Sequence, residues 1–385
     1  MTIRITHVVP TLGRGGAERQ LVDLVLNTEP GSFEHRVCYL RPPDGFARQL
    51  TEAGTDVVDL GVRGSIPWFH AATRLSSLLK AAPPDVLHTW LYDANLSARL
   101  ASLAVPRIPT VTSLQFTDYE PGSIRGNGWP AWKVGLLRRL DAASARWSKP
   151  SFVACSAHVK QSAVRYLGVK EASVRVIYNS VDPRRLVSRA DDGRALRRSL
   201  AIPADGVLFL NVGRLDPQKG QRYLLSAFQK LAETSPRAYL AVAGDGPMKK
   251  ELTQLASELK VSERCRFLGS RDDIQTCLAM ADVFVFPSVS EGFGIALMEA
   301  MYKGLPCIAS RLGAICELVE DGKSGLLVTP ESAVALFEAM STLYRDAALR
   351  ARLGARSEEE AKSRFQVRAT MPQWEALYRE LAQRD

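Results

Sequence analysis

Short runs of apolar residues, rich in Val, Ile and Leu, alternate with amphipathic stretches from one end of the chain to the other. Near-continuous apolar runs are typical of parallel strands buried on both faces, because a half-exposed strand alternates apolar with polar residues. In the intervening segment 17–27, Leu21, Leu24 and Val25 lie on one face of a predicted helix. This alternation predicts an α/β fold with doubly wound parallel sheets. The predicted strands are 3–9, 35–40, 56–60, 85–90, 110–114, 151–156, 174–178, 207–213, 238–244, 265–269, 282–288, 306–310 and 325–328.

The length of 385 residues favours two domains over a single hydrophobic core. A polar, basic segment at about residues 182–200 is poor in large apolar side chains, and we interpret it as the linker. We therefore predict two α/β domains over residues 1–185 and 186–367, and the amphipathic C-terminal segment, residues 371–383, would either finish the second domain or cross back onto the first. Ligands bind beyond the carboxyl ends of the strands in such folds, so a cleft between two facing domains is where function is expected.

Composition excludes several classes of function. No apolar run reaches the ~18 residues of a membrane-spanning helix, and the N-terminus lacks a signal peptide's apolar centre, so we expect a cytoplasmic protein. A net charge of +9 suits an anionic ligand or an anionic membrane surface, whereas no nucleic-acid recognition motif is visible. The six cysteines form no C-x-x-C pair and the histidines lack ligand spacing, so no metal site is predicted.

A glycine-rich loop, residues 13–18, follows the first predicted strand. Its glycines would let the backbone approach a ligand, and the helix that follows could face an anion. A dinucleotide fingerprint would require glycine where Glu18 stands and an acidic residue after the second strand, which ends in Leu40 and Arg41. A dehydrogenase is therefore disfavoured, while a plain tight turn remains an alternative for this loop.

Two further loops follow predicted strands of the second half. Residues 213–220 place Arg214 and Lys219 in a turn before a helix, where they would clamp a diphosphate or form a solvated basic loop. Residues 244–247 fit a strand-to-helix turn with proline at the first helical position, or a close approach to ligand. No Asp-x-Asp pair occurs in the chain, so the two cations, rather than a metal ion, are expected to neutralise the diphosphate.

The stretch SEGFGIALMEAM begins at Ser290 and places Glu291 and Glu299 around a glycine turn and a helix start. The backbone amides of residues 293–295 would bind sugar hydroxyls or phosphate oxygens. Glu291 would accept hydrogen bonds from hydroxyls, although an acid that only stabilises the helix dipole is the alternative. That alternative does not explain Glu299, which lies among apolar residues and would reach a ribose diol.

The stretch EGFGIALMEAM resembles the E-x7-E motif of the retaining glycosyltransferases of family 4. The resemblance covers nearly the whole chain, and it implies two facing Rossmann-like domains of the GT-B type, with residues 368–385 returning to the N-terminal domain. The further matching stretches are GGAE, HVKQSAVRYLGV, VRVIYNSVD, NVGRLDPQKG, AGDGP, FLGSRDD, DVFVFPS, GLPCIAS and GKSGLLV.

The resemblance implies a nucleotide-diphospho-sugar donor, a UDP-sugar before a GDP-sugar, held mostly by the C-terminal domain. It assigns catalysis to Arg214, Lys219 and Glu291, and it places residues 269–271 near the base. The implied donor-binding residues are Gly15, Gly16, Gly213, Arg214, Lys219, Gly244, Gly269, Arg271, Glu291, Phe293, Gly294, Ile295 and Glu299.

The acceptor side departs from the family pattern. Many members carry a histidine at the end of the fifth strand, where this chain has Ser113. His88 is kept in the fourth strand, and Gln115 and Asp118 follow the fifth by position, so these four residues are the acceptor-side candidates. The acceptor implied by the resemblance is a glycan or a lipid-linked glycan.

Residues 128–147 combine apolar residues at helical spacing with basic side chains. A helix that touches an anionic membrane surface would have this pattern, as would a domain helix whose apolar stripe faces the core. The apolar residues are Trp129, Trp132, Leu136, Leu140 and Trp147, and the basic ones are Lys133, Arg138, Arg139 and Arg146.

The predicted function is metal-independent transfer of a hexosyl or N-acetylhexosaminyl group with retention, in surface polysaccharide or glycolipid biosynthesis. Arg214 and Lys219 would stabilise the departing diphosphate, which itself would take the acceptor's proton. A sugar-nucleotide epimerase or a phosphorylase on the same fold, and a non-catalytic sugar-nucleotide binding protein, remain alternatives.

Overall fold

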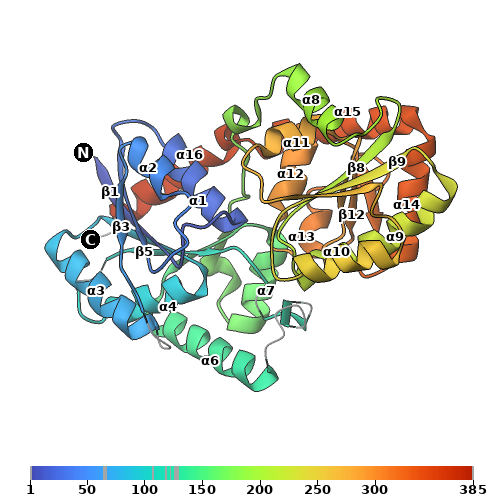
Figure 1. Ribbon diagram of the computed structural model, residues 1–385. Coiled ribbons are helices and arrows are strands. Elements are labelled where there is room, and N and C mark those ends of the chain that lie inside the picture. Colours follow the sequence, from blue (N-terminus) through green and yellow to red (C-terminus); the bar gives the residue numbers. More distant parts are fainter. Residues whose placement is uncertain are drawn as a thin grey trace. The chain divides into compact units, whose positions relative to one another are not determined.

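The computed structural model describes residues 2–63, 67–105, 108–117, 119–121, 123–124 and 130–383. The chain forms two compact units (Figure 1). One comprises residues 1–120, 129–180 and 367–385, and the other comprises residues 121–128 and 181–366. Each unit is a parallel sheet with helices on both faces, which confirms the predicted α/β fold with two Rossmann-like sheets.

The first unit contains a sheet of order β3-β2-β1-β4-β5-β6-β7. Its strands are β1 (Ile3–Val9), β2 (Phe33–Tyr39), β3 (Asp56–Asp59), β4 (Val86–Trp90), β5 (Thr110–Leu114), β6 (Ser151–Ala154) and β7 (Val174–Val176). Its helices are α1 (Gly16–Asn27), α2 (Ala47–Glu52), α3 (Pro67–Ala81), α4 (Leu91–Ala101), α6 (Ala131–Ser148), α7 (Ala157–Leu167) and α16 (Val367–Ala382), with the 3-10 helix η1 (Glu171–Ser173).

Strand β1 shows why the apolar runs are continuous. Ile5 packs in one cluster with Leu21 of α1 and Leu377 of α16. Val8, which points to the opposite face, packs in a second cluster with Leu75 of α3. Helices α1 and α16 therefore cover one face of the sheet, and α3 and α4 cover the other (Figure 1). Both faces are dry, so successive strand residues are apolar.

The second unit contains a sheet of order β10-β9-β8-β11-β12-β13, and α9, α10 and α14 pack on one of its faces. Its strands are β8 (Val207–Val212), β9 (Ala238–Ala243), β10 (Cys265–Gly269), β11 (Val283–Phe286), β12 (Cys307–Ser310) and β13 (Gly325–Val328). Its helices are η2 (Pro183–Leu186), α8 (Ala190–Ser199), η3 (Pro217–Lys219), α9 (Gln221–Thr234), α10 (Lys249–Glu258), α11 (Ile274–Met280), α12 (Ile295–Tyr302), α13 (Gly313–Cys316), α14 (Ala333–Arg345) and α15 (Ala347–Arg364).

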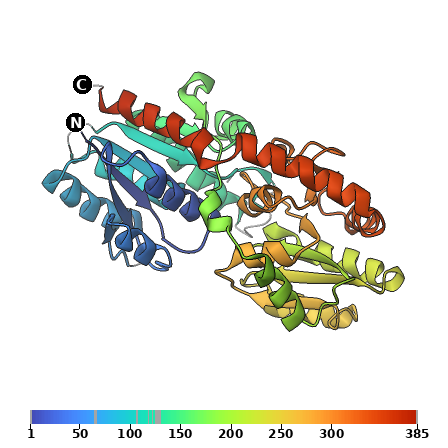
Figure 2. The ribbon, with the colours of Figure 1, turned by 90° about the horizontal axis from the view of Figure 1, so that it is seen from above.

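Besides the segment 121–128, the chain passes between the units at residues 180–181 and at 366–367. The segments at these last two crossings are adjacent, because the Val181 amide donates to the Phe365 carbonyl at 2.8 Å. After residue 367, α16 runs along the first unit (Figure 2), where Trp374 and Tyr378 are buried in the core that contains β1.

The segment interpreted as a linker, residues 182–200, differs from that expectation. It contains η2 and α8, and α8 packs closely on α11. A Cβ added at Gly193 would lie 2.6 Å from the backbone of Ala279. The segment is therefore part of the second unit, although its packing relies on a glycine rather than on large apolar residues.

The helices and the cysteines of the described residues bear on membrane spanning and on thiol chemistry. No helix among them is long and apolar enough to cross a membrane. The six cysteines are unpaired, and all except Cys316 are buried. Burial raises the pKa of Cys38, Cys265 and Cys307 to about 12, so these thiols are inert.

Candidate functional site

Four neighbouring strands of the second unit, β10, β9, β8 and β11, end at one edge of the sheet, and the predicted donor loops follow them. The Gly213 amide donates to the Ala243 carbonyl at 3.0 Å, and the Gly244 amide donates to the Gly269 carbonyl at 2.8 Å. A Cβ at Gly244, whose φ is 150°, would lie 1.9 Å from the Gly213 carbonyl oxygen. Gly244 is thus required by contact between two loops.

Lys219 and Glu291 form an ion pair at this edge. Lys219 ends η3, and its stem passes over Gly213, where an added Cβ would lie 3.8 Å from Lys219 Cδ. Its Nζ lies 2.5 Å from Glu291 Oε1, and Ser288 Oγ donates to the same oxygen at 2.8 Å. The Glu291 side chain is buried, so its charge is balanced by the lysine rather than by water.

Arg214 differs from Lys219 in exposure. Its side chain is 70% exposed, and its Nε lies 3.7 Å from Asp216 Oδ2, a weak surface pair. The Arg214 guanidinium is therefore accessible to an incoming anion. Lys219, at 23% exposure, is held in place by its carboxylate.

The turn at residues 291–294 leads into α12. Gly294 is the N-cap, with φ of 99°, and no side chain caps the helix. The Phe293 ring is buried edge-on against Phe365, with centroids 5.7 Å apart and planes at 78°. The amides of the first turn, beginning at Ile295, therefore have no intrahelical acceptors and are available to oxygen atoms of a ligand.

Glu299 is a buried carboxylate in the apolar helix α12. Its neighbours in sequence are fully buried, and Glu299 itself is 7% exposed. Arg185 of η2 donates from Nη1 and from Nη2 to Glu299 Oε1, each at 3.1 Å. Arg185 was not among the predicted site residues, because nothing in the sequence distinguishes it from the adjacent Arg184 in a basic segment.

The loop after β10 contributes two candidates. Gly269 has φ of 68°, and an added Cβ would have no neighbour within 4 Å, so the space beside it is open. Arg271 is directed along its own loop, donating to the two oxygens of Asp273 at 2.8 and 2.6 Å. Arg271 is therefore paired with Asp273 within its own loop.

The glycine loop of the first unit has an internal reason for its composition. Gly15 is the N-cap of α1 and Gly16 its first residue. A Cβ at Gly15 would lie 2.1 Å from Glu18 Oε2, while Thr11 Oγ1 donates to Glu18 Oε1 at 3.1 Å. Gly15 thus makes room for a buried carboxyl group, and burial raises the pKa of Glu18.

His88 and Ser113 are brought together in the core of the first unit. His88 has no exposed surface; its Nε2 lies 2.7 Å from Ser113 Oγ and its Nδ1 lies 2.8 Å from Tyr378 Oη. Nearby, His7 Nε2 lies 3.0 Å from His35 Nδ1. Burial lowers the pKa of His88 and of His7 well below the ordinary range, so both imidazoles stay neutral. His88 connects the sheet to α16, and His7 connects β1 to β2.

Comparison with known proteins covers both units. Residues 14–185 match the family described as Glycosyltransferase Family 4, and residues 192–360 match the family described as Glycosyl transferases group 1. The chain belongs to the glycosyltransferases of family 4.

Two relatives of this glycosyltransferase match most of its length. The N-acetyl-alpha-D-glucosaminyl L-malate synthase of Bacillus anthracis is 29% identical over 82% of this chain and 79% of that protein. The lipopolysaccharide core biosynthesis glycosyltransferase LpsE of Rhizobium meliloti is 28% identical over 91% of this chain and 92% of that protein.

Solved structures share the fold of this glycosyltransferase. Anabaena Alr3699/HepE in complex with UDP-glucose aligns with a TM-score of 0.86 and 23% identity, covering 98% of this chain and all of that chain. WaaG, a glycosyltransferase involved in lipopolysaccharide biosynthesis, aligns with a TM-score of 0.78 and 16% identity, covering 97% of this chain and 99% of that chain. Both likenesses support the GT-B fold.

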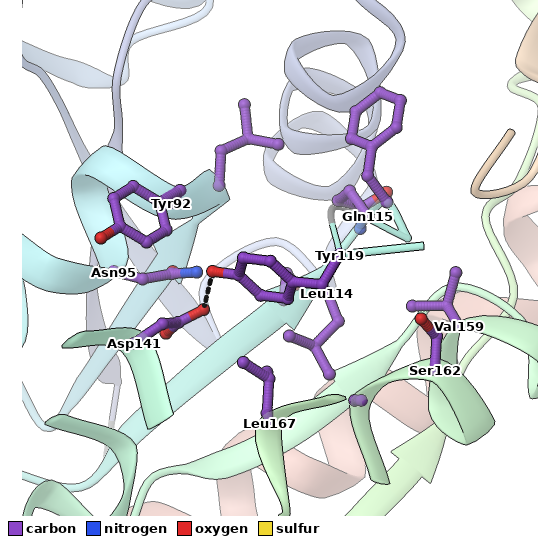
Figure 3. A pocket seen from close by; sticks show the side chains of 13 residues that line it. Tyr92, Asn95, Leu114, Gln115, Tyr119, Asp141, Val159, Ser162 and Leu167 are labelled. Carbon is purple, nitrogen blue, oxygen red and sulfur yellow. Dashed lines mark hydrogen bonds between the residues drawn. The ribbon is translucent and has the colours of Figure 1, made fainter. Parts of the chain in front are cut away.

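A pocket of the glycosyltransferase's first unit lies beyond β4 and β5 and is bordered by α4, α6 and α7 (Figure 3). Gln115 lines it and accepts a hydrogen bond from Asn179 at 2.9 Å. Asn95 also lines it, and its buried Oδ1 has no hydrogen-bond partner within the described part of the chain. The Asp141 carboxylate is occupied by Arg99 at 2.5 Å and by the Tyr119 hydroxyl at 2.9 Å.

Two of the four acceptor-side candidates, Ser113 and Gln115, line this pocket, whereas Asp118 lies outside the described residues. Asn95 was not a candidate, because an asparagine inside an amphipathic helix is indistinguishable from a surface residue by pattern. Leu91, which also lines the pocket, has φ of 66°, a strained conformation of the kind found at binding sites.

Proposed function

We propose that this glycosyltransferase moves a sugar from a nucleotide-diphospho-sugar, a UDP-sugar first, to a hydroxyl group of a glycan or a lipid-linked glycan, with retention and without a metal ion. The observation that carries the proposal is the pairing of Lys219 with Glu291 beside the accessible Arg214, at the carboxyl edge of a parallel sheet. The binding of UDP-glucose by the structural neighbour HepE supports a UDP-sugar donor.

In the proposed reaction the bond from the anomeric carbon to the diphosphate oxygen breaks, and its electron pair leaves with the diphosphate. Arg214 and Lys219 stabilise that negative charge, a role worth about 3 kcal/mol for a key group. The acceptor oxygen bonds to the anomeric carbon on the same face, and its proton passes to the departing phosphate. Glu291, released from Lys219, accepts hydrogen bonds from the sugar hydroxyls.

The class of sugar and the biosynthetic setting rest on the relatives. The names of the B. anthracis enzyme and of HepE's ligand support an N-acetylhexosaminyl or hexosyl group. The names of LpsE and WaaG support a role in lipopolysaccharide or surface polysaccharide biosynthesis. The pocket with Asn95 supports an acceptor that offers a hydroxyl group, because the unpartnered Oδ1 requires a donor.

A membrane surface is part of the proposal because of α6. Trp132 is 73% exposed, and Leu136, Leu140 and Trp147 on the same stripe are also exposed. Exposed basic residues flank the stripe, and Asp141, the only acid of α6, is buried against Arg99. An exposed apolar stripe with a basic border fits an anionic lipid surface. Trp129, the remaining aromatic of the predicted stripe, lies outside the described residues.

The donor proposal is tested by thermal shift with UDP-, GDP-, ADP- and dTDP-sugars on three proteins: wild type, Lys219→Ala and Lys249→Ala. Lys249 is a half-exposed lysine that pairs with Asp245 near the same edge, and it is the matched control. One donor should raise the Tm of wild type and of K249A, and should raise that of K219A far less. An equal shift in K219A would remove the diphosphate role of Lys219.

A further inference from the structure

The buried Glu299 carboxylate has a counter-charge that comes from outside its own loop and helix. Arg185 and Glu299 are far apart in sequence, and their side chains are 21% and 9% exposed. Both guanidinium Nη atoms converge on Oε1, each at 3.1 Å. No hydrogen bond within the described part of the chain engages Glu299 Oε2, so one oxygen is fixed and the other remains available.

The position of Arg185 is determined by its surroundings. Asp182 caps η2 by accepting from the Arg184 amide at 2.9 Å, and it also binds the Arg184 guanidinium. Arg184 is thereby directed back onto Asp182, while Arg185 extends toward α12. The next residue, Leu186, is buried, and its carbonyl accepts from Lys303 Nζ at 3.3 Å. The guanidinium is therefore presented from a rigid 3-10 turn rather than from a free segment.

The packing around Glu299 explains why such a partner is needed. Leu297, Met298, Ala300 and Met301 are fully buried, so α12 offers the carboxylate little solvent. A carboxylate in this setting requires a paired cation and hydrogen bonds to stay ionised. An ionised carboxylate is also a stronger acceptor for hydroxyl groups than a neutral carboxyl group.

We propose that Arg185 is a positioning residue for the donor's ribose, an inference that rests on the proposed function. It supplies the counter-charge of Glu299 and orients the carboxylate so that the open oxygen accepts hydrogen bonds from the vicinal 2′ and 3′ hydroxyls. Arg185 does not touch the reacting atoms. Its effect reaches the donor through Glu299, and it determines how strongly the protein distinguishes a ribose from a deoxyribose.

The experiment measures the Kd of UDP, GDP and ADP by calorimetry, and then the Kd of the 2′-deoxy form of whichever binds. The proteins are wild type, Arg185→Met, Arg185→Lys, Glu299→Gln, the double variant R185M/E299Q, and Arg184→Met. Arg184 is the matched control, since it is adjacent in sequence and paired with Asp182. Thermal unfolding without ligand checks that each variant is folded.

Wild type and R184M should prefer the ribose form. R185M should weaken its binding about tenfold and abolish the preference, with partial recovery in R185K. The double variant should be no weaker than E299Q, since both residues act through one carboxylate. If R185M binds the ribose form as tightly as wild type or more tightly, or if it keeps the ribose preference of wild type, the role of Arg185 is refuted and the proposed function is unaffected. Failure of wild type to bind any of the three nucleotides, together with no Tm shift from any of the four nucleotide-sugars, would overturn the proposed function.

Discussion

Acid is expected to destabilise the first unit through its buried histidines. Burial lowers the pKa of His35 from 6.5 to about 4, and burial together with the neighbouring His88 and His35 lowers the pKa of His7 well below 6.5. His88 is also kept neutral by burial. In the unfolded chain all three would bind protons as the pH falls below 6.5. The unfolded state then binds more protons than the folded state, so stability falls with pH.

The magnitude for His35 follows from its shift. The contribution of His35 to the unfolding free energy is fully present above pH 6.5 and is lost as the pH falls toward about 4. At about 1.4 kcal/mol per pKa unit, the loss is about 2 kcal/mol between about pH 7 and pH 5, and about 3 kcal/mol by pH 4. Burial also lowers the pKa values of His7 and His88, so these two histidines add losses of the same sign.

Tryptophan fluorescence during guanidinium unfolding is the suitable assay. The five tryptophans among the described residues all belong to the first unit, and Trp90 and Trp374 lie beside His88, with ring centroids 4.6 and 5.1 Å away. The comparison is wild type against His35→Gln at about pH 7 and about pH 5, with His70→Gln of α3 as the control. Carboxylates that titrate are common to all three proteins, so the difference reports on His35 and on its coupling to His7 and His88.

H35Q should lose about 2 kcal/mol less than wild type between the two pH values, whatever its stability at neutral pH. H70Q should lose as much as wild type. If H35Q and wild type lose equal amounts, His35 does not titrate below its ordinary range, and the explanation from burial is refuted.

Two further predictions concern the loops and α6. Gly244→Ala should lower the unfolding free energy of the second unit by about 3 kcal/mol, because its Cβ would meet the Gly213 carbonyl. Gly322→Ala, where the backbone is left-handed but the space is open, should lower it by about 1 kcal/mol. Unfolding followed by circular dichroism measures both, and equal losses of unfolding free energy would contradict the explanation by contact. Wild type should bind phosphatidylcholine vesicles only when phosphatidylglycerol is added, and high salt should weaken the binding. The double variant Trp132→Ser/Trp147→Ser should bind these vesicles about tenfold more weakly, whereas Val334→Ser of α14 should bind them as wild type does. Vesicle binding that is unchanged by salt and by loss of the two tryptophans would show that α6 is not the membrane-binding surface.

Many of the strands were predictable because they are buried on both faces, although β3 at the edge of its sheet is exposed or half-buried. Residues 110–114 and 325–328 coincide with β5 and β13, even though β5 places the polar Thr112 and Ser113 in buried positions. Segment 190–199 was not recognised as a helix of the second unit. It packs through backbone contact at Gly193, and such a contact leaves no apolar periodicity in the sequence.

The candidate site was predictable where one short motif contains all the chemistry. Glu291 and Glu299 stood out because carboxylates are unusual in an apolar helix and its preceding turn. Their partners were harder to identify. Lys219 was selected as a phosphate ligand, but its pairing with Glu291 joins loops after two different strands. Arg185 and Tyr378 act through contacts across long sequence separations, which only the folded chain reveals.

Charge pairing limits how the proposed donor could enter. Although the chain carries a net charge of +9, the buried carboxylates at the donor edge are already balanced, Glu291 by Lys219 and Glu299 by Arg185. A diphosphate that bound Arg214 alone would have only a weak surface partner. If Lys219 turns to the phosphate instead, Glu291 loses its counter-charge and needs hydrogen bonds from the sugar hydroxyls. The diphosphate and the sugar therefore assist each other's binding, so an intact nucleotide-sugar should bind more tightly than the nucleoside diphosphate alone.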